Sequence, residues 1–338
     1  MNGKSRPLVS VVTPVYNCEA YLAECIESVQ HQDYDNWEYI IVNNCSTDCS
    51  RDIAEQYAAR DSRIRIHNNQ HFLDVIANHN HALRQISPES TYCKLLFADD
   101  WLFPECLDKM VSLADRYPTI GIVGAYGIRG RNLMWEGLPY SDAPVPGQTM
   151  CRLKLKHGIH VFGTGSSTLI RSELIRERHA FYNESNLHAD TEACLEVLKD
   201  HDYGFVHQVL VYIRDREALT SYSRRVNTYL AARLYELDRF GPTNLTSAEL
   251  RTSRAECLRQ YYVFLAKSVF LRRDEAFWQF HKDKLKELGR PLSLPRLAVS
   301  VGGWIVDGLL NPLHALQTFR ARRSRSGGYD SVLKELGA

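Results

Sequence analysis

Two adjacent carboxylates, Asp99 and Asp100, directly follow an apolar run of strand length at residues 94–98. Neighbouring carboxylates repel each other unless a cation lies beside them. A hard divalent ion such as Mg²⁺ or Mn²⁺ binds one or two carboxylates and completes its coordination shell with substrate phosphate and water. The pair therefore predicts a metal site. Asp100 could instead cap a helix that starts near Pro104, and both roles hold together if Asp99 faces the cleft.

Further polar residues follow two earlier apolar runs, at residues 8–13 and 39–42. They are Pro14, Val15, Tyr16 and Asn17 after the first run, and Asn43, Asn44, Cys45, Ser46, Thr47 and Asp48 after the second. In open α/β sheets, ligands bind in the crevice beyond the carboxyl ends of the strands. Each group alone could be an ordinary turn, because Asn and Asp tolerate turn geometry. Three such groups, each behind an apolar strand, favour one shared binding cleft.

The elements that must position these residues alternate between short β-rich runs and helical patterns over about the first 125 residues. Strands are expected at residues 8–13, 39–42, 64–66, 92–98 and 120–125, with helices between them. The first of these helices has apolar residues at helical spacing, namely Leu22, Cys25, Ile26 and Val29. This alternation predicts an α/β fold with a doubly wound, mostly parallel sheet.

The second half of the chain has a different pattern. From residue 126 to 160 the periodicity fades and Gly and Pro accumulate, which predicts a long functional loop. Beyond it, strands are expected at residues 167–170 and 203–213, and helices at 226–240 and 248–288. Thr246 and Glu249 match the pattern of a capping box at the start of the last helical segment.

Composition restricts the class of partner. Among the 338 residues, 41 Lys and Arg nearly balance 40 Asp and Glu, so no global field attracts nucleic acid. The nine cysteines are an odd number, and the first residues lack the apolar core of a signal peptide. We therefore expect free thiols in a reducing cytosol. The sequence contains no Gly-rich dinucleotide motif and no P-loop, which disfavours dehydrogenases and P-loop enzymes.

The motifs, in this order and at this spacing, resemble those of the family 2 nucleotide-sugar glycosyltransferases, which have the GT-A fold. The resemblance covers roughly residues 7–222. In the nucleotide-sugar half, residues 9–17 resemble the family's opening strand and uridine platform, 22–32 its first helix, and 43–48 its Asp-Asp-Gly-Ser-x-Asp turn. Residues 80–83 resemble its Asn-x-Gly-Ile helix, and residues 98–100 with Pro104 resemble its metal motif. Further on, residues 163–171 resemble the strand before the acceptor region, and Asp190 stands at the end of the family's Glu-Asp pair.

The resemblance implies a role for each matching residue. The donor site would comprise Pro14, Val15, Tyr16, Asn17, Asn43, Asn44, Asp48, Ala98, Asp99 and Arg214, and the metal ligands would be Asp99 and Asp100. Within this site, Tyr16 would stack on the nucleotide base, and Asn44 takes the position of the base-reading Asp. Asp190 would be the general base that removes the proton of the acceptor.

Four departures from the family pattern affect these roles. Asn43 and Asn44 replace acidic residues, and an Asn oxygen still accepts a hydrogen bond from a base N–H, but without charge. Phe97 stands at the first Asp of the metal motif, which leaves fewer carboxylates near the ion. Ala189 replaces the Glu that precedes the general base. Arg216 stands where a His is common, and its guanidinium could hold diphosphate oxygens.

The implied reaction is an inverting, metal-dependent transfer. The leaving nucleoside diphosphate gains negative charge, which a metal ion neutralises without proton transfer. A base on the opposite face of the sugar takes the proton of the acceptor hydroxyl. Asp190 is expected to begin a helix, where the helix dipole and free N–H groups favour an ionised carboxylate. Glu192 is the next candidate for the general base. The chain lacks the Gln-x-x-Arg-Trp motif of processive polymerases, so one sugar per encounter is expected.

The C-terminal segment leaves two alternatives open. Residues 297–319 contain one acidic residue, Asp307, and no Lys or Arg, and four arginines follow between residues 320 and 325. Such a segment could lie in a membrane interface, with the arginines attracted to anionic lipid. It could equally dock on the protein's own domain and leave a solvated basic tail. Its three glycines and Pro312 argue against a spanning helix.

We therefore expect a hexosyl- or related transferase that moves one sugar from a nucleotide diphosphate sugar, UDP-linked by resemblance, to a glycan or lipid-linked acceptor. Synthesis of a surface polysaccharide or similar glycan is the expected setting. The location would be cytoplasmic, and peripheral on the inner face of the membrane if the tail binds lipid. The alternative is a catalytically weak nucleotide-sugar-binding scaffold, which the substitutions at Asn43, Asn44 and Phe97 motivate.

The expected domain organisation has three parts. A GT-A domain would occupy residues 1–222, with a nucleotide-sugar half at about 7–125 and an acceptor half at about 126–222. A helical extension would follow at residues 223–290, and an apolar and basic tail at 291–338.

Overall fold

The computed structural model describes residues 6–141, 143–214, 226–271 and 273–310. The chain divides into two compact units. Unit 1 comprises Met1–Cys151 and His160–Asp215, and unit 2 comprises Arg152–Ile159 and Arg216–Ala338. The predicted donor, metal and catalytic residues, from Pro14 to Arg214, lie in unit 1. Arg216 and the arginines after residue 319 lie outside the described residues.

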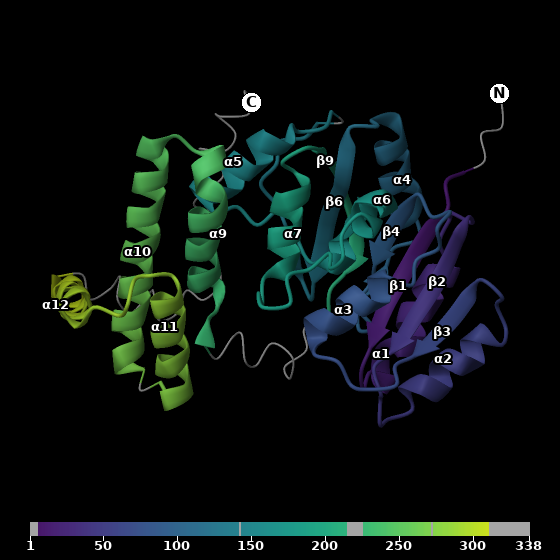
Figure 1. The fold of residues 1–338 in the computed structure, drawn as a ribbon, viewed down its shortest axis with the longest axis horizontal. Coiled ribbons are helices and arrows are strands. Elements are labelled where there is room, and N and C mark those ends of the chain that lie inside the picture. Colours follow the sequence, from purple (N-terminus) through teal and green to yellow (C-terminus); the bar gives the residue numbers. More distant parts are fainter. Residues whose placement is uncertain (1–5, 142, 215–225, 272, 311–338) are drawn as a thin grey trace. The chain divides into compact units, whose positions relative to one another are not determined.

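Unit 1 is built on one sheet with the strand order β3-β2-β1-β4-β8-β6-β9-β5, and β7 pairs with β6 (Figure 1). The strands are β1 (Val9–Val15), β2 (Trp37–Asn43), β3 (Ile64–Asn68), β4 (Tyr92–Leu95), β5 (Trp101–Leu102), β6 (Ile120–Arg129), β7 (Asn132–Met134), β8 (Thr168–Arg171) and β9 (Asp202–Tyr212). The longest pairings, β1 with β2 and β6 with β9, are parallel, whereas β8 is antiparallel to both of its neighbours. The predicted α/β class with a mostly parallel sheet is confirmed.

Helices cover the sheet, and α1 and α4 do so with one apolar face each. The helices of unit 1 are α1 (Glu19–Gln30), α2 (Ser50–Ala58), α3 (Val75–Leu83), α4 (Cys106–Arg116), α6 (Ser172–Arg176) and α7 (Ala189–Val197), with the first residues of α5 (Gly147–His157). The buried residues of α1 are those predicted from its spacing: Leu22, Cys25, Ile26 and Val29. They share one hydrophobic core with Val9 and Val11 of β1 and with Leu107 of α4.

The segment from residue 126 to 160 contains regular structure, so its prediction as a long loop is wrong. β6 continues to Arg129 and forms a hairpin with β7, and α5 starts at Gly147. Five of the six residues from Met150 to Leu155 are buried, nearly all round the helix, and Arg152 is half-buried. Such a helix shows no amphipathic stripe, and its periodicity is therefore invisible in the sequence.

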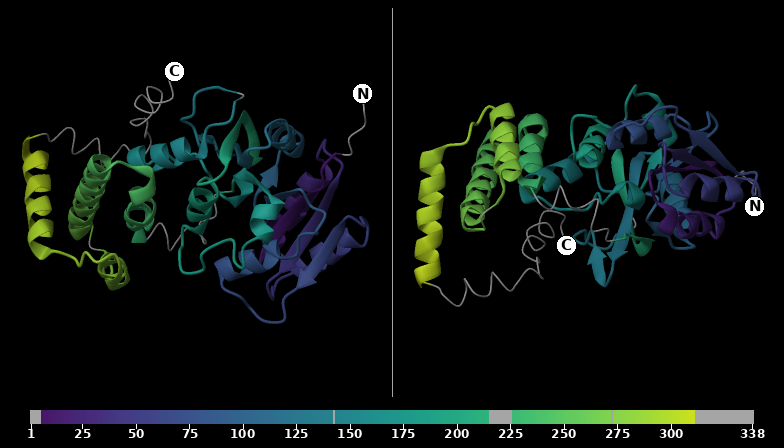
Figure 2. Two further views of the ribbon diagram at one scale, coloured as in Figure 1. Left: turned by 45° about the horizontal axis from the view of Figure 1, so that its top comes forward. Right: turned by 90° about the horizontal axis from the view of Figure 1, so that it is seen from below.

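Unit 2 is helical (Figure 2). Besides the end of α5 it contains α9 (Tyr229–Asn244), α10 (Ser247–Phe270), α11 (Glu275–Glu287) and α12 (Leu294–Leu310). The predicted capping box is present: Thr246 Oγ1 accepts the N–H of Glu249, and the Glu249 carboxylate accepts the N–H of Thr246. The predicted helical segment at 248–288 is two helices, because Asp274 caps the start of α11 by accepting the N–H of Phe277.

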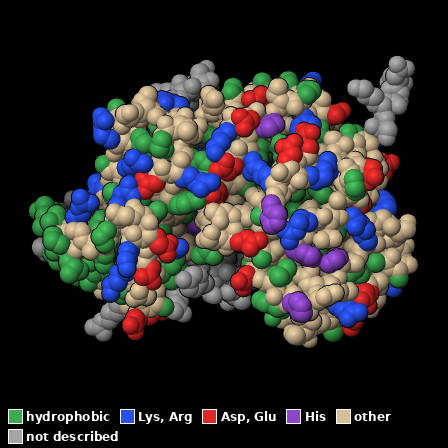
Figure 3. Space-filling view, viewed as in Figure 1, with side chains coloured by type: hydrophobic (Ala, Val, Ile, Leu, Met, Phe, Trp, Pro, Cys, Tyr) green, Lys and Arg blue, Asp and Glu red, His purple; other side chains and the backbone are tan. Residues whose placement is uncertain are grey.

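Exposed apolar side chains in unit 2 gather on α12, as Figure 3 shows. One side of α12 packs on α10, with the rings of Trp304 and Phe270 at a centroid distance of 4.6 Å. The exposed large apolar residues of α12 are Leu294, Val299, Ile305, Val306 and Leu310. Within the part of the chain that the structure describes, no helix is both long and apolar enough to span a bilayer.

Candidate functional site

The loops after β1 and β2 are hydrogen-bonded to each other. The two strands pair in parallel along their whole length, so both loops leave the same edge of the sheet. Asn17 Oδ1 accepts the backbone N–H of Thr47 at 2.8 Å, and the N–H of Asn17 donates to Ser46 Oγ at 3.1 Å. Asn17 has φ 47°, in the left-handed region that Asn tolerates better than most residues. These loops, residues 14–17 and 43–48, form what we call the platform, and Tyr16 projects from it, 47% exposed.

Asp48 holds the two helices that follow the platform. Its Oδ2 accepts the N–H of Glu19 at the start of α1, and its Oδ1 accepts the N–H of Ser50 at the start of α2, both at 3.0 Å. Partial burial opposes ionisation, but the hydrogen bonds from Ser50 and from the Glu19 backbone outweigh it and lower the pKa of Asp48. Both carboxylate oxygens are thus used at helix N-termini, and a direct contact of Asp48 with a nucleotide stays a prediction.

Asn43 and Asn44 are buried, and their side-chain amides are bonded within the protein. Asn43 donates to Asn68 Oδ1 at 2.9 Å and accepts the N–H of Ser46 at 3.1 Å. Asn44 donates to the carbonyl of Leu73 at 2.8 Å and accepts the N–H of Leu73 at 2.9 Å. The sequence does not indicate these bonds, because most of the partners lie on the next strand and the loop behind it.

The acidic pair lies at the end of the strand region that continues β4. The side chain of Asp99 is partly exposed, whereas Asp100 is 3% exposed. Asp100 Oδ1 accepts the N–H of Arg214 at 3.0 Å, and Arg214 Nε donates to the carbonyl of Asp99 at 3.0 Å. The guanidinium of Arg214 also pairs with Glu24 of α1. Arg214 therefore joins the acidic pair to the end of β9 and to the helix that follows the platform.

The donor set at this pair fits a divalent cation. Asp100 Oδ2 is buried and has no hydrogen-bond partner among the described residues. Burial, together with the charge of Asp99, raises the pKa of Asp100 to about 7. A buried carboxylate oxygen without a donor, beside a second carboxylate, is stabilised by a hard cation. Within the described ranges no three His, Cys, Asp or Glu side chains cluster as metal ligands, so phosphate and water would have to complete the shell.

A short 3₁₀ turn, η1 (Gly165–Ser167), lies against the residues that precede the acidic pair. Ser166 Oγ accepts the N–H of Phe97 at 3.0 Å. The fully buried Lys94 donates to the carbonyls of Ser166 at 2.5 Å and Thr168 at 3.2 Å, and its burial lowers the pKa of its ammonium group. Sequence analysis did not identify Lys94, although a lysine inside an apolar strand was a visible signal. It fixes this turn against β4.

Glycine is required at two positions at the start of the same turn. Gly163 has φ 71°, and a Cβ there would collide with Ser167 Oγ. A Cβ on Gly165 would come within 2.6 Å of the Leu95 side chain. The turn can therefore approach β4 closely only with these residues. The position of the turn therefore depends on the missing side chains at Gly163 and Gly165 as well as on the hydrogen bonds from Lys94.

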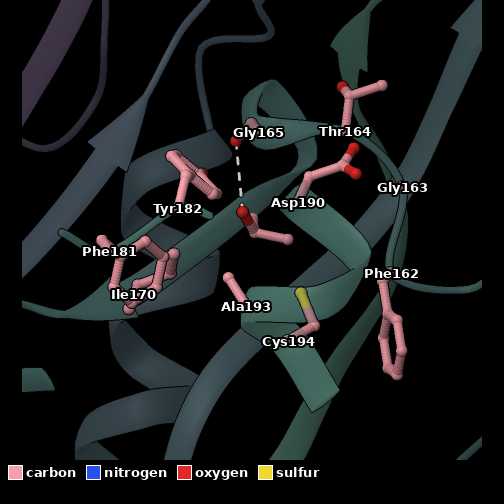
Figure 4. Close-up of a pocket in the computed structure, with 11 residues that line it drawn as sticks. Phe162, Gly163, Thr164, Gly165, Ile170, Phe181, Tyr182, Asp190, Ala193 and Cys194 are labelled. Atoms are coloured by element: carbon pink, nitrogen blue, oxygen red, sulfur yellow. Dashed lines mark hydrogen bonds between the residues drawn. The ribbon is translucent and has the colours of Figure 1, made fainter. Parts of the chain in front are cut away.

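Asp190 lies at the start of α7 and lines a cavity of about 10 Å³, roughly the space of one water molecule. The same cavity is lined by Thr164, Gly165 and Tyr182. Figure 4 shows the Asp190 carboxylate turned toward Thr164. Asp190 and the acidic pair therefore both lie against the segment that contains η1. The structure bears out the prediction that Asp190 begins a helix, and its catalytic role stays a prediction.

Two residues near Asp190 are held by bonds that the sequence did not predict. Asn80 of α3 donates to the carbonyl of Tyr182 and accepts its N–H, both at 2.8 Å, which ties α3 to the segment before Asp190. Glu192 is 3% exposed and accepts hydrogen bonds from the amides of Asn183 and Asn186. Glu192 is thus the less accessible of the two predicted candidates for the base.

Phe97, which departs from the family's metal motif, packs on a histidine. The rings of Phe97 and His79 are stacked with centroids 5.3 Å apart. Burial lowers the pKa of His79 to about 4, so this imidazole is neutral at pH 7. The position thus provides an apolar wall next to η1. It brings no third carboxylate to the acidic pair.

Comparison with known proteins gives matches to one family. The model of glycosyl transferase family 2 matches residues 10–178. EpsE of Bacillus subtilis (strain 168), a candidate glycosyltransferase, is 35% identical over 155 residues, which cover 44% of this chain and 55% of EpsE. The match thus spans about half the length of that relative.

Solved structures share the fold. S. aureus TarS 1-349 in complex with UDP-GlcNAc aligns with a TM-score of 0.61 at 17% identity, over 83% of this chain and 80% of the other. The mannosyltransferase PcManGT from Pyrobaculum calidifontis, in complex with GDP-Man and Mn²⁺, aligns with a TM-score of 0.52 at 16% identity, over 94% and 84% of the two chains. At this identity the likeness shows the fold, which is of the GT-A type.

Proposed function

The chain belongs to glycosyl transferase family 2, and from this we propose that it transfers one sugar from a nucleoside diphosphate sugar to an acceptor hydroxyl. The donor is UDP-linked in this proposal, the acceptor is a glycan or a lipid-linked glycan, and the configuration at the anomeric carbon is inverted. The observation that carries the proposal is the grouping of three features along the carboxyl edge of one sheet. They are the platform, the acidic pair at Asp99 and Asp100, and Asp190 on the segment around η1.

The platform and Arg214 would hold the donor. Tyr16 offers a half-exposed ring on which a nucleotide base can stack, next to the backbone of Pro14 and Val15. The guanidinium of Arg214 lies beside the acidic pair, where its charge would favour diphosphate oxygens. These contacts orient the donor before reaction, which lowers the entropy lost on reaching the transition state.

Asp99 and Asp100 would hold Mg²⁺ or Mn²⁺. When bound, such an ion neutralises the charge that develops on the leaving diphosphate. The buried Asp100 oxygen without a donor would supply one ligand, and the more exposed Asp99 would supply another. Lys94, through the turn that it holds, keeps the backbone before this pair in place.

Asp190 would take the proton of the acceptor hydroxyl. Its place at the N-terminus of α7 favours the ionised carboxylate, and the N–H of Thr191 donates to its Oδ1 at 2.7 Å. Proton transfer would come late, because the hydroxyl becomes acidic only as its bond to the sugar forms. The cavity beside the carboxylate gives room for a small polar group.

Turnover with a panel of nucleotide sugars, with and without chelator, tests the proposal. We expect activity with Mg²⁺ or Mn²⁺ that excess chelator abolishes, and strong loss of both donor binding and turnover in Asp99→Asn with the fold retained. Full activity in excess chelator would contradict the metal role. Nucleotide-sugar binding without any turnover would instead favour the scaffold alternative, which the internal engagement of the Asn43 and Asn44 amides also motivates.

We also place the enzyme on a membrane surface, as suits a lipid-linked acceptor in surface polysaccharide synthesis. α12 supports this part of the proposal, because a mostly apolar helix leaves Leu294, Val299 and Leu310 more than two-thirds exposed. Apolar area of this kind marks an interaction site on soluble proteins. The arginines between residues 320 and 325 follow α12 in the sequence and would favour an anionic surface.

A further inference from the structure

The oxygen of Asn44 has no capacity left for a nucleotide base. Asn44 Oδ1 accepts the N–H of Leu73 and the amide of Asn69, both at 2.9 Å, so both of its lone pairs are used. Its Nδ2 donates to the carbonyl of Leu73 at 2.8 Å, and the residue is 3% exposed. The Asn44 side chain therefore binds both the N–H and the carbonyl of Leu73, as a neighbouring β-strand would.

The loop that Asn44 holds is fixed at its other end as well. The N–H of Asn69 donates to the carbonyl of Asn43 at 2.9 Å, and the Asn69 amide also donates to Asn78 Oδ1 of α3 at 2.9 Å. Residues 69–73 are thus bonded to β2 and to α3.

This loop presents an aromatic ring to the platform. Phe72, next to the clamped Leu73, is 54% exposed, and its ring lies 4.9 Å from that of Tyr16 at an interplanar angle of 65°. Exposed phenylalanine at a site edge is unfavourable in water, because its apolar area is not buried. The two rings form an aromatic corner, in which a flat group could stack on one ring and meet the other at its edge.

We propose that Phe72 contacts the base of the donor nucleotide and that Asn44 acts through it, as a positioning residue that does not itself read the base. This inference rests on the proposed function. It differs from the role that the family resemblance implies for Asn44, because that role requires a free acceptor oxygen. Base affinity in this protein then depends on stacking in the aromatic corner, which contributes to binding for every base.

Isothermal titration of the full chain with UDP and with inorganic pyrophosphate, in Mn²⁺ buffer, tests the inference. Phe72→Ala should weaken UDP binding about 5- to 100-fold, the range typical for loss of one stacking ring. Binding of pyrophosphate, which has no base, should change less than about twofold. Phe72→Trp should restore UDP affinity. Tyr140→Ala is the matched control, because Tyr140 is an exposed aromatic residue, 80% accessible, outside the platform.

A double-mutant cycle distinguishes a positioning role of Asn44 from direct contact of Asn44 with the base. Asn44→Ala should weaken UDP binding, and adding it to Phe72→Ala should cause less than about a twofold further loss, because both changes remove one interaction. Multiplicative losses would show that Asn44 meets the base directly and overturn its assigned role. Unchanged UDP affinity in Phe72→Ala would overturn the inference alone. A wild-type chain that binds neither UDP nor any nucleotide sugar would overturn the proposed function itself.

Discussion

At the scale of single residues, the carboxylate of Asp190 has the clearest expected effect on rate. Asp190→Asn keeps the shape of the side chain and removes the proton acceptor, so turnover should fall by about 10²–10⁴, as for loss of a general base. Donor binding should persist, because the donor contacts lie on the platform and at the acidic pair. Steady-state kinetics together with UDP titration check this, and a variant with near wild-type turnover would move the base elsewhere.

Lys94 is expected to affect the stability of the fold and the position of the turn η1. In Lys94→Met the chain keeps its volume but the carbonyls of Ser166 and Thr168 lose their buried donor, which costs about 1–3 kcal/mol of unfolding free energy. The turn η1 should loosen with it, and the metal-dependent part of donor binding should weaken. Thermal melting and Mn²⁺ titration measure the two effects. A variant that melts at the wild-type temperature would show that the amine is dispensable.

Spacing and residue type could predict which positions gather at the sheet edge, but not what each side chain bonds to. The predictions placed Asn17 and Asn44 correctly after the ends of β1 and β2, because apolar runs reveal those ends. The strand predicted at 92–98 is shorter in the structure, where β4 ends at Leu95, so Asp99 lies four residues beyond it. The side chain of Asn44 bonds to Leu73 and Asn69, which lie on a different loop, and the pairing of β2 with β3 brings that loop close. Long-range bonds of this kind leave no local pattern. Asn80 was missed as a tether for the same reason, whereas Lys94, a lysine inside an apolar strand, was a local signal that went unused.

At the scale of elements, α11 contains a group that makes stability depend on pH. The fully buried His281 donates from Nε2 to the carbonyl of Val226 at 2.7 Å, while its Nδ1 accepts the hydroxyl of Tyr261 at 2.6 Å. Burial lowers its pKa to about 4, so the native state keeps the imidazole neutral where the unfolded chain protonates it below about 6.5.

Stability should therefore fall as the pH drops from about 6.5 toward 4. This group alone should remove about 2 kcal/mol of unfolding free energy between pH 7 and pH 5. His281→Leu is less stable at pH 7 because it loses both hydrogen bonds, but its stability should fall less on acidification. Urea unfolding of both proteins at the two pH values tests this. Parallel losses in the two proteins would assign the pH dependence to other groups.

Elements with a one-sided apolar pattern were predictable, and the others were not. α1 and α4 show their buried faces in the sequence, and the capping box at Thr246 marks the start of α10. β5 has two residues, too few for any period, and α5 is buried nearly all round. Secondary structure in the segment at 126–160 is therefore set by tertiary packing, which sequence patterns do not record.

At the scale of the whole molecule, the prediction concerns attachment to a membrane surface through α12. A chain that ends after Ser293 should lose binding to anionic liposomes, because it lacks both the exposed apolar side chains and the arginines that follow. Its melting temperature should stay close to that of the full chain, since one side of α12 alone packs on α10. Flotation at low salt and thermal melting are the measurements.

A matched pair of point variants sharpens this test. Val299→Ser removes apolar area from α12, and Leu187→Ser removes a similar exposed side chain from unit 1. The first should weaken liposome binding and the second should leave it unchanged. A full-length chain that never floats with anionic lipid at low salt rules attachment out. Truncation that lowers the melting temperature markedly would favour a segment docked on the protein itself.

The boundary inside α5 has a consequence for the order in which the chain folds during synthesis. Residues 152–159 belong to unit 2, whose other members begin at Arg216. The buried Lys154 pairs with Glu236 of α9 at 3.6 Å, and Leu153 and Leu155 beside it are fully buried. A nascent chain must therefore carry this half-helix, apolar and charged, without its partners until α9 leaves the ribosome. Until then the end of α5 is open to chaperones and proteases.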